Sequence, residues 1–118
     1  MPAGPDEAVR RLAAACHPGD ADAIEAALHP DAVAVSDSGA PAPAAAQAAR
    51  GAAGVARLLR ALLPGTDVTT ESVNGRAGLV LRRAGVAVAV IAVSHDEARA
   101  TALWIVRNPA KLRGWHRR

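Results

Sequence analysis

The order of its hydrophobic patterns assigns this chain to the α+β class. Apolar residues at helical spacing occur in three segments before residue 64, and four segments with the alternation of β-strands follow. Helices that precede a run of antiparallel strands are typical of α+β domains. The 118 residues, 51% of them hydrophobic, suffice for one core. We therefore expect residues 1–118 to form a single domain, with flexible ends at residues 1–5 and 114–118.

The first two helices are expected to be short. Residues 6–16 place apolar side chains on one helical face, and the Pro-Gly pair at residues 18 and 19 ends that helix. Asp20 is a suitable N-cap for a second helix, which we expect to end near the His-Pro-Asp sequence at residues 29–31.

The central part of the chain predicts a strand, a loop and a third helix. Val33, Val35 and Asp37 alternate with small side chains, as in a short strand that ends at an acid. The Pro/Ala-rich residues 38–50 have no clear periodicity, so we expect a long loop. The strongest helical pattern follows, and a Pro-Gly pair ends it. Its apolar positions are Val55, Leu58, Leu59, Leu62 and Leu63.

The C-terminal half predicts an antiparallel meander. Its strands cover residues 67–73, 79–82, 86–94 and 99–107. The Asn74-Gly75 pair between the first two strands is a strong hairpin signal. The last two strands are apolar on both faces, whereas a solvated antiparallel sheet has one polar face. The second apolar face needs a partner, and we expect a homodimer that packs through the sheet.

Composition and charge argue against several classes of protein. The single cysteine, Cys16, cannot form an intramolecular disulfide, and the longest apolar run, residues 86–93, is far shorter than the about 20 residues that span a membrane. The formal charge is +3, and residues 107–118 carry five basic and no acidic residues. Such a segment can attract phosphates, but no aromatic series for stacking bases accompanies it. We expect a cytoplasmic protein with a solubilising basic end and without a membrane or nucleic-acid partner.

Several stretches of the chain resemble SnoaL-like (nuclear transport factor 2-like) domains. They are residues 13–23, 28–39, 73–75, 78–81 and 104–112, the last ending in the most specific piece, Asn-Pro-Ala-Lys-Leu. They look most like the C-terminal SnoaL-like extension of a subgroup of extracytoplasmic-function sigma factors. The resemblance implies a cone, in which a curved antiparallel sheet wraps around three N-terminal helices and encloses a pocket. It also implies a regulatory role, because the extension contacts the sigma core and is not an enzyme.

Two departures limit what this resemblance transfers. The chain starts with Met just before the matching region, so we expect a stand-alone domain without the promoter-binding sigma regions. The family's glycine-rich acidic motif that ends in lysine is Asp-Ser-Gly-Ala-Pro at residues 37–41 here, without the lysine and two of the glycines. The contacts of the fused regulator are therefore not carried over to this chain.

Asp37 is the candidate general base. It shares a strand face with Val33 and Val35, and a carboxylate that looks into an apolar cone is suited to take up a proton. Steroid-isomerase-like relatives add a tyrosine and a second acid, but this chain has no tyrosine and its last two strands carry no acid. Epoxide-hydrolase-like relatives use two acids and an arginine, and only Asp67 and Glu71 offer a further acid. The alternative is that Asp37 caps the turn into the following loop.

A pocket in the cone would take its lining from the strands and the third helix. We expect the lining to be Val33, Val35, Asp37, Leu58, Leu62, Val88, Val90 and Trp104, with Trp104 either in the pocket or on the outer face of the sheet. The adjacent His95 and Asp96 are expected in a solvated turn, and Cys16 as an inert core thiol. His17 and His29 lack a third ligand, so we expect neither a metal ion nor a cofactor.

The last segment is expected to dock on the domain. Pro109 cannot donate to a strand ladder, so the last strand should end near residue 107 or 108, and Asn108 can fix the exit through its side-chain amide. Leu112 would then fold back onto the domain, with Lys111 left outside for a partner.

These observations favour a non-catalytic SnoaL-like module that binds a small apolar ligand, a protein partner, or both. The alternative is a small isomerase, cyclase or hydrolase of the same superfamily that uses Asp37 as its general base. A second acid or an arginine across the pocket from Asp37 would favour the enzyme.

Overall fold

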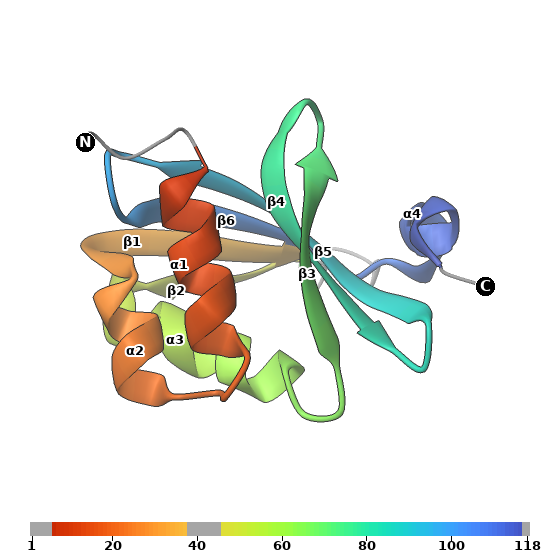
Figure 1. Ribbon diagram of the computed structural model, residues 1–118, viewed down its shortest axis with the longest axis horizontal. Coiled ribbons are helices and arrows are strands. Elements are labelled where there is room, and N and C mark those ends of the chain that lie inside the picture. The colour runs from red at the N-terminus through yellow and green to blue at the C-terminus, as the bar shows by residue number, and fades with distance from the viewer. Residues whose placement is uncertain (1–5, 38–45, 117–118) are drawn as a thin grey trace.

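The computed structural model describes residues 6–37 and 46–116, which form one six-stranded sheet with helices on both faces (Figure 1). The elements in chain order are α1 (Glu7–Cys16), α2 (Ala21–Ala26), β1 (Leu28–Asp37), β2 (Ala46–Arg50), α3 (Gly51–Leu62), β3 (Asp67–Val73), β4 (Arg76–Arg83), β5 (Val86–His95), β6 (Ala100–Val106), α4 (Pro109–Leu112) and a final 3₁₀ turn (Arg113–Trp115). None of the helices in the described part of the chain has the length and apolar character to cross a membrane.

The sheet has the strand order β2-β1-β6-β5-β4-β3, and its strands are antiparallel except for the parallel pair β1 and β6. The β3–β4 hairpin turns at Asn74 and Gly75, which both have positive φ angles, 53° and 80°. Two successive residues with positive φ are the mark of the hairpin turn that matches strand twist. The structure therefore confirms the α+β class, the cone-like curved sheet and the meander of β3 to β6.

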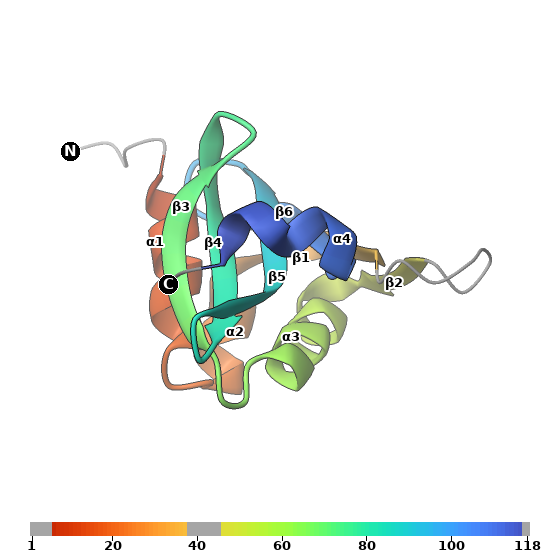
Figure 2. The same ribbon diagram turned by 90° about the vertical axis from the view of Figure 1, so that its right-hand side faces the viewer.

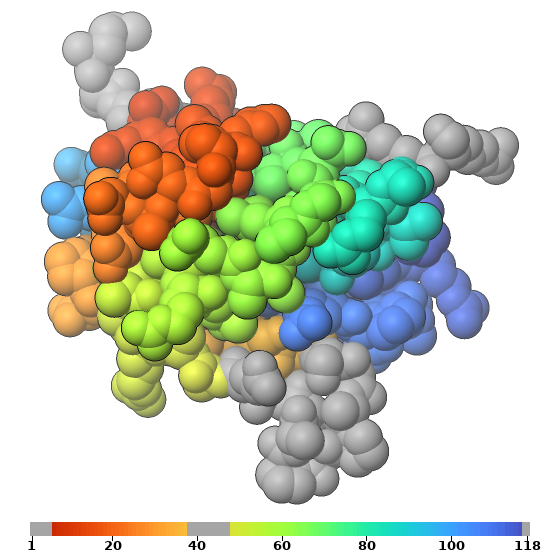
Figure 3. Space-filling model, turned by 90° about the horizontal axis from the view of Figure 1, so that it is seen from below, coloured from red at the N-terminus to blue at the C-terminus, as the bar shows by residue number. Residues whose placement is uncertain are grey.

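Helices α1, α2 and α3 cover one face of the sheet, called here the inner face (Figure 1). Asp20 starts α2 as expected, because its side chain accepts hydrogen bonds from the backbone N–H groups of Asp22 and Ala23. Seen from below, the red-to-orange atoms of α1 and α2 adjoin the yellow-green atoms of α3 (Figure 3). The fully buried inner-core residues include Val9, Leu12, Ile24, Val55, Leu59, Leu79, Leu81, Ile91 and Ile105.

The opposite, outer face of the sheet carries α4 and the 3₁₀ turn (Figure 2). Here Leu112 joins Val73, Val80, Ala87 and Val90 in a second, smaller core. This contact separates the outer face into a part that the chain covers itself and a part that it leaves open.

Two boundaries before residue 51 differ from the sequence-based expectations. Residues 46–50 form the edge strand β2 and not the end of a loop, because β1 offers a free edge that can pair with even an alanine-rich segment. β1 begins at Leu28, so the sequence at residues 29–31 belongs to the strand and not to the end of α2. The other expected loop residues, 38–45, lie outside the described part of the chain.

Candidate functional site

The register of β1 and β6 decides which face carries the predicted site residues. Val33, Val35 and Asp37 pair with Ala102, Trp104 and Val106 across the parallel ladder. Leu103 and Ile105, which alternate with these partners on β6, belong to the inner core. Val33, Val35 and Asp37 therefore lie on the outer face, which corrects the expectation that they look into the cone. The small side chains of Ala34 and Ser36 occupy the inner face of β1 instead.

On this outer face lies a shallow groove of about 300 Å³, the outer-face groove. Its apolar lining comes from β1, β3, β5 and β6, and Asn74 and Arg76 contribute polar groups. Trp104 is 48% exposed and Val33 37% exposed, so two large apolar side chains are presented to solvent here. The apolar lining includes Val33, Val35, Val73, Ala92 and Trp104. Trp104 thus takes the outward of the two orientations considered.

The eight expected pocket residues do not share one site. Val33, Val35 and Trp104 line the outer-face groove together. Val90 is buried next to it on the same face, beneath Leu112. Leu58 and Leu62 of α3 and Val88 of β5 are half-buried and pack against the inner core.

Asp37 holds the C-terminal part of the chain. Its Oδ2 atom accepts a hydrogen bond from Lys111 Nζ at 2.9 Å, and its backbone oxygen accepts one from the Arg107 N–H at 2.7 Å. Lys111 is therefore engaged with Asp37 and not left for a partner. The pair lies on the outer side of the sheet, away from the apolar interior in which a general base was expected.

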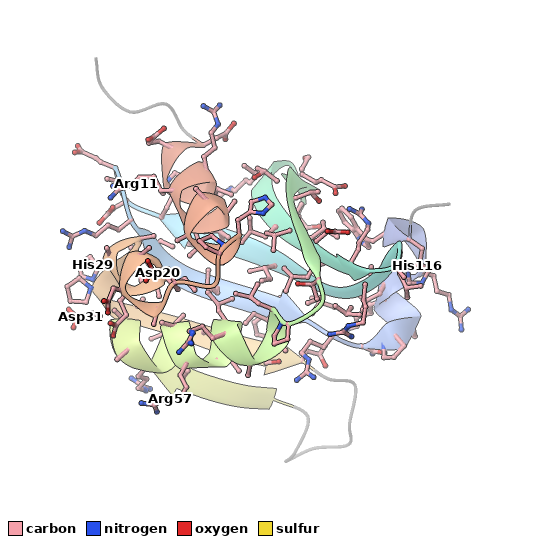
Figure 4. All side chains as sticks on the ribbon, turned by 60° about the horizontal axis from the view of Figure 1, so that its bottom comes forward. Arg11, Asp20, His29, Asp31, Arg57 and His116 are labelled. Carbon is pink, nitrogen blue, oxygen red and sulfur yellow. The ribbon has the colours of Figure 1, made fainter. Side chains whose placement is uncertain are left out.

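Residues 108–116, called here the C-terminal segment, contact the outer face through one buried side chain and several hydrogen bonds. Asn108 caps α4 by accepting a hydrogen bond from the Ala110 N–H at 3.0 Å, and Leu112 is 2% exposed, so this residue docks as the sequence predicts. The carbonyl oxygen of Trp115 accepts a hydrogen bond from Arg82 Nε at 2.7 Å. His116, labelled in Figure 4, accepts one from the Ala87 N–H through Nδ1 at 2.9 Å. Trp115 and His116 thus both contact the sheet, within the stretch from residue 114 that the sequence predicts to be flexible.

Sequence reasoning missed the polar cluster beneath this segment. Arg82 is only 5% exposed, and its Nη2 atom donates to Glu71 Oε1 at 3.1 Å while Nη1 donates to Thr69 Oγ1 at 3.1 Å. A signal for it exists, because counting back from the Asn74-Gly75 turn puts Thr69, Glu71 and Arg82 on one face of the hairpin. The cluster contains an acid and an arginine, but it lies on the outer face and Asp37 is not part of it.

The remaining titratable candidates have structural surroundings. Burial raises the pKa of the Cys16 thiol to about 11, which keeps it protonated and unreactive. His95 and Asp96 are exposed, and hydrogen bonds from the backbone N–H groups of Arg99 and Ala98 hold the pKa of Asp96 below its usual value. Within residues 6–37 and 46–116, no three histidine, cysteine or acidic side chains come close enough to hold a metal ion.

Comparisons with known proteins agree with this architecture. The profile of the family described as SnoaL-like domain matches residues 9–117. The sigma factor SigJ of Mycobacterium tuberculosis, an extracytoplasmic-function RNA polymerase sigma factor, is 33% identical over 122 residues, covering 92% of this chain and 39% of the relative. The chain thus spans well under half of that protein. The crystal structure of SigJ matches 93% of this chain and 44% of its own with a TM-score of 0.64 and 30% identity. An epoxide hydrolase structure from M. tuberculosis matches 89% of this chain and 83% of its own with a TM-score of 0.56 and 21% identity, which is a likeness of fold.

Proposed function

The chain belongs to the SnoaL-like domain family, and we propose that it is a non-catalytic member that binds a protein partner through the outer-face groove. The observation that carries the proposal is the exposure of Trp104 and Val33 beside one apolar groove. Exposed tryptophan is a common anchor of protein interfaces. We expect this binding to take place in the cytoplasm, where a chain with one buried thiol needs no disulfide.

The placement of the charged groups supports binding over catalysis. The inner face is lined by fully buried aliphatic side chains such as Leu79, Leu81 and Ile91. The acid expected to act as a base, Asp37, and the buried arginine, Arg82, both lie on the outer face. Enzymes that transfer protons place their acids and bases around the substrate, in a pocket that excludes water.

A second copy of the chain is the partner that the groove fits best. Trp104 lines the groove with Val33 and Val35 and is half exposed, so one face carries both an exposed ring and a hollow. In a two-fold dimer each copy contributes the same surface, and a ring next to a hollow is then self-complementary. The proposed assembly is a homodimer in which each Trp104 packs into the groove of the other copy.

A charge at the centre of this interface tests the proposal. We expect Trp104→Arg to weaken self-association in sedimentation velocity at least tenfold, because it would bury two unpaired guanidinium groups. Val86→Arg is the matched control, since Val86 is a comparably exposed apolar residue on a hairpin outside the groove. A monomeric wild-type chain at high micromolar concentration, or a dimer indifferent to Trp104→Arg, would rule out this assembly.

Native mass spectrometry distinguishes a second copy of the chain from other molecules that could bind in the groove. A small apolar molecule that copurifies with a monomer and is lost in Trp104→Arg would identify the groove as a ligand site instead. The similarity to SigJ makes a sigma factor the first different protein to test as a partner, with the same pair of variants.

A further inference from the structure

The C-terminal segment and the outer-face groove adjoin on one face of the sheet. Along β5, Val90 lies beneath Leu112 and Ala92, two residues further, lines the groove. Side chains two residues apart in a strand point to the same face. Val73 belongs to both places, because it is part of the same buried cluster as Leu112 and also lines the groove. The apolar surface is therefore continuous, and the segment covers one part of it.

From this continuity we infer that the C-terminal segment is an autoinhibitory strap, which limits self-association by occupying part of the surface that a second copy would use. The inference rests on the proposed dimer. Sheets that pack face to face lie about 10 Å apart, whereas a helix with its side chains is about 10–12 Å across. A second sheet cannot lie flat over α4. With the strap closed, a partner reaches only the end of the face around Val33 and Trp104.

The size of the open surface explains why the strap matters. A stable interface covers roughly 800 Å² on each partner. The open part of the face consists of a shallow groove and two exposed large side chains, Val33 and Trp104. Release of the strap would add Val80, Ala87 and Val90, which are now buried in the cluster that Leu112 and Trp115 help to form. The closed form then associates weakly and the open form tightly.

The contacts of the strap are of a kind that can be released. The segment leaves β6 after Val106 and is held by the buried Leu112, by the partly buried Trp115 and by a few separate polar contacts. Of these, the bond from Lys111 to Asp37 involves a lysine side chain that is 58% exposed, so water can replace it at low cost. His116 is exposed as well. Short segments with few buried contacts open more readily than the core of a domain.

The test uses full-length variants that loosen the strap and two independent readouts. Leu112→Ala removes the buried anchor, Lys111→Gln removes the ion pair, and Arg113→Gln is the control, because it removes a charge from an exposed residue of the same segment. Hydrogen exchange at the Ala87 amide reports strap opening, since this N–H donates to His116. Sedimentation velocity over a concentration series measures the dissociation constant of the dimer.

We expect faster exchange at Ala87 in Leu112→Ala, together with a dimer that is roughly tenfold tighter, because affinity scales with the population of the open form. Lys111→Gln should give a smaller change in the same direction, and Arg113→Gln none. Adding Trp104→Arg to Leu112→Ala should abolish the tightening.

Each other outcome overturns the inference. If the wild-type chain dimerises through Trp104 but opening of the strap leaves the affinity unchanged, the strap is not inhibitory and the proposed dimer stands. Tightening that survives Trp104→Arg would mean non-specific adhesion of the uncovered surface. Unchanged exchange at Ala87 in Leu112→Ala would mean that Leu112 does not hold the strap. Monomers in every variant would overturn the proposed dimer and the strap together.

Discussion

On its inner face the sheet buries side chains such as Leu79 and Ile91 completely beneath three helices. On its outer face Val80 and Val90 are buried only beneath the short C-terminal segment, and Trp104 is left half exposed. Strands β5 and β6 carry apolar side chains on both faces, so the composition of these two strands does not distinguish the faces. The difference lies in how each is covered: helices within the domain close the inner face permanently, whereas a terminal segment closes part of the outer face through contacts that can be undone.

The largest expected effect on stability comes from truncating two buried leucines, one on each side of the sheet. Leu59→Ala should lower the free energy of unfolding by about 3 kcal/mol, because it leaves a cavity between α3 and the inner face. Leu112→Ala should cost less, about 1–2 kcal/mol, because α4 can shift to fill part of the space. Urea denaturation of both variants measures the difference. Equal losses would mean that the C-terminal segment is as integral to the fold as α3.

The sequence predicted the fold well where the signals are local. The helical stripe of α3, the Asp20 cap and the Asn74-Gly75 hairpin depend on residues close in the chain, and each was placed correctly. β2 was missed because its residues, mostly alanine, have no strand preference of their own. Its strand conformation depends on the exposed edge of β1, which only the folded sheet provides.

The site was harder to predict because it depends on which face of β1 turns inward. The alternation of β1 showed that Val33, Val35 and Asp37 share a face, but both faces of the strand are apolar enough to be buried. The parallel pairing with β6 decides the question, and that pairing joins residues about 70 positions apart. The bond from Lys111 to Asp37 follows from the same long-range register and has no local signal.

An intermediate effect on stability is expected when the two ion pairs of the outer face are broken one at a time. Glu71→Gln should destabilise the domain by about 2 kcal/mol, because it leaves the buried guanidinium of Arg82 without its counter-charge, although Glu71 itself is partly solvated. Lys111→Gln should change stability by less than about 1 kcal/mol, because the lysine side chain is 58% exposed and water and salt screen its charge. Thermal unfolding at low and at high salt checks both values.

The control for these two variants is how their loss of stability depends on salt concentration. The loss in Glu71→Gln should persist in high salt, whereas the small effect of Lys111→Gln should vanish there. A salt-sensitive loss in Glu71→Gln would show that Arg82 is accessible to solvent and that the C-terminal segment opens in the native state more often than its contacts indicate.

The last comparison concerns one polar side chain on each face. Removing the hydroxyl should lower the free energy of unfolding on the outer face but not on the inner face. On the outer face Thr69 Oγ1 accepts a hydrogen bond from Arg82 and donates one to Glu71, so Thr69→Val should cost about 1–2 kcal/mol through the loss of both bonds. On the inner face the hydroxyl of Ser36 is buried without a hydrogen-bond partner in the described part of the chain. Ser36→Ala removes that unsatisfied group and keeps the β-carbon that packs on α3, so stability should stay level or rise by up to about 1 kcal/mol. Differential scanning calorimetry of the two variants under one condition is sensitive enough. A clear loss in Ser36→Ala would mean that the hydroxyl has a partner in solution, and a polar partner inside the cone would be a reason to reconsider a ligand on the inner face.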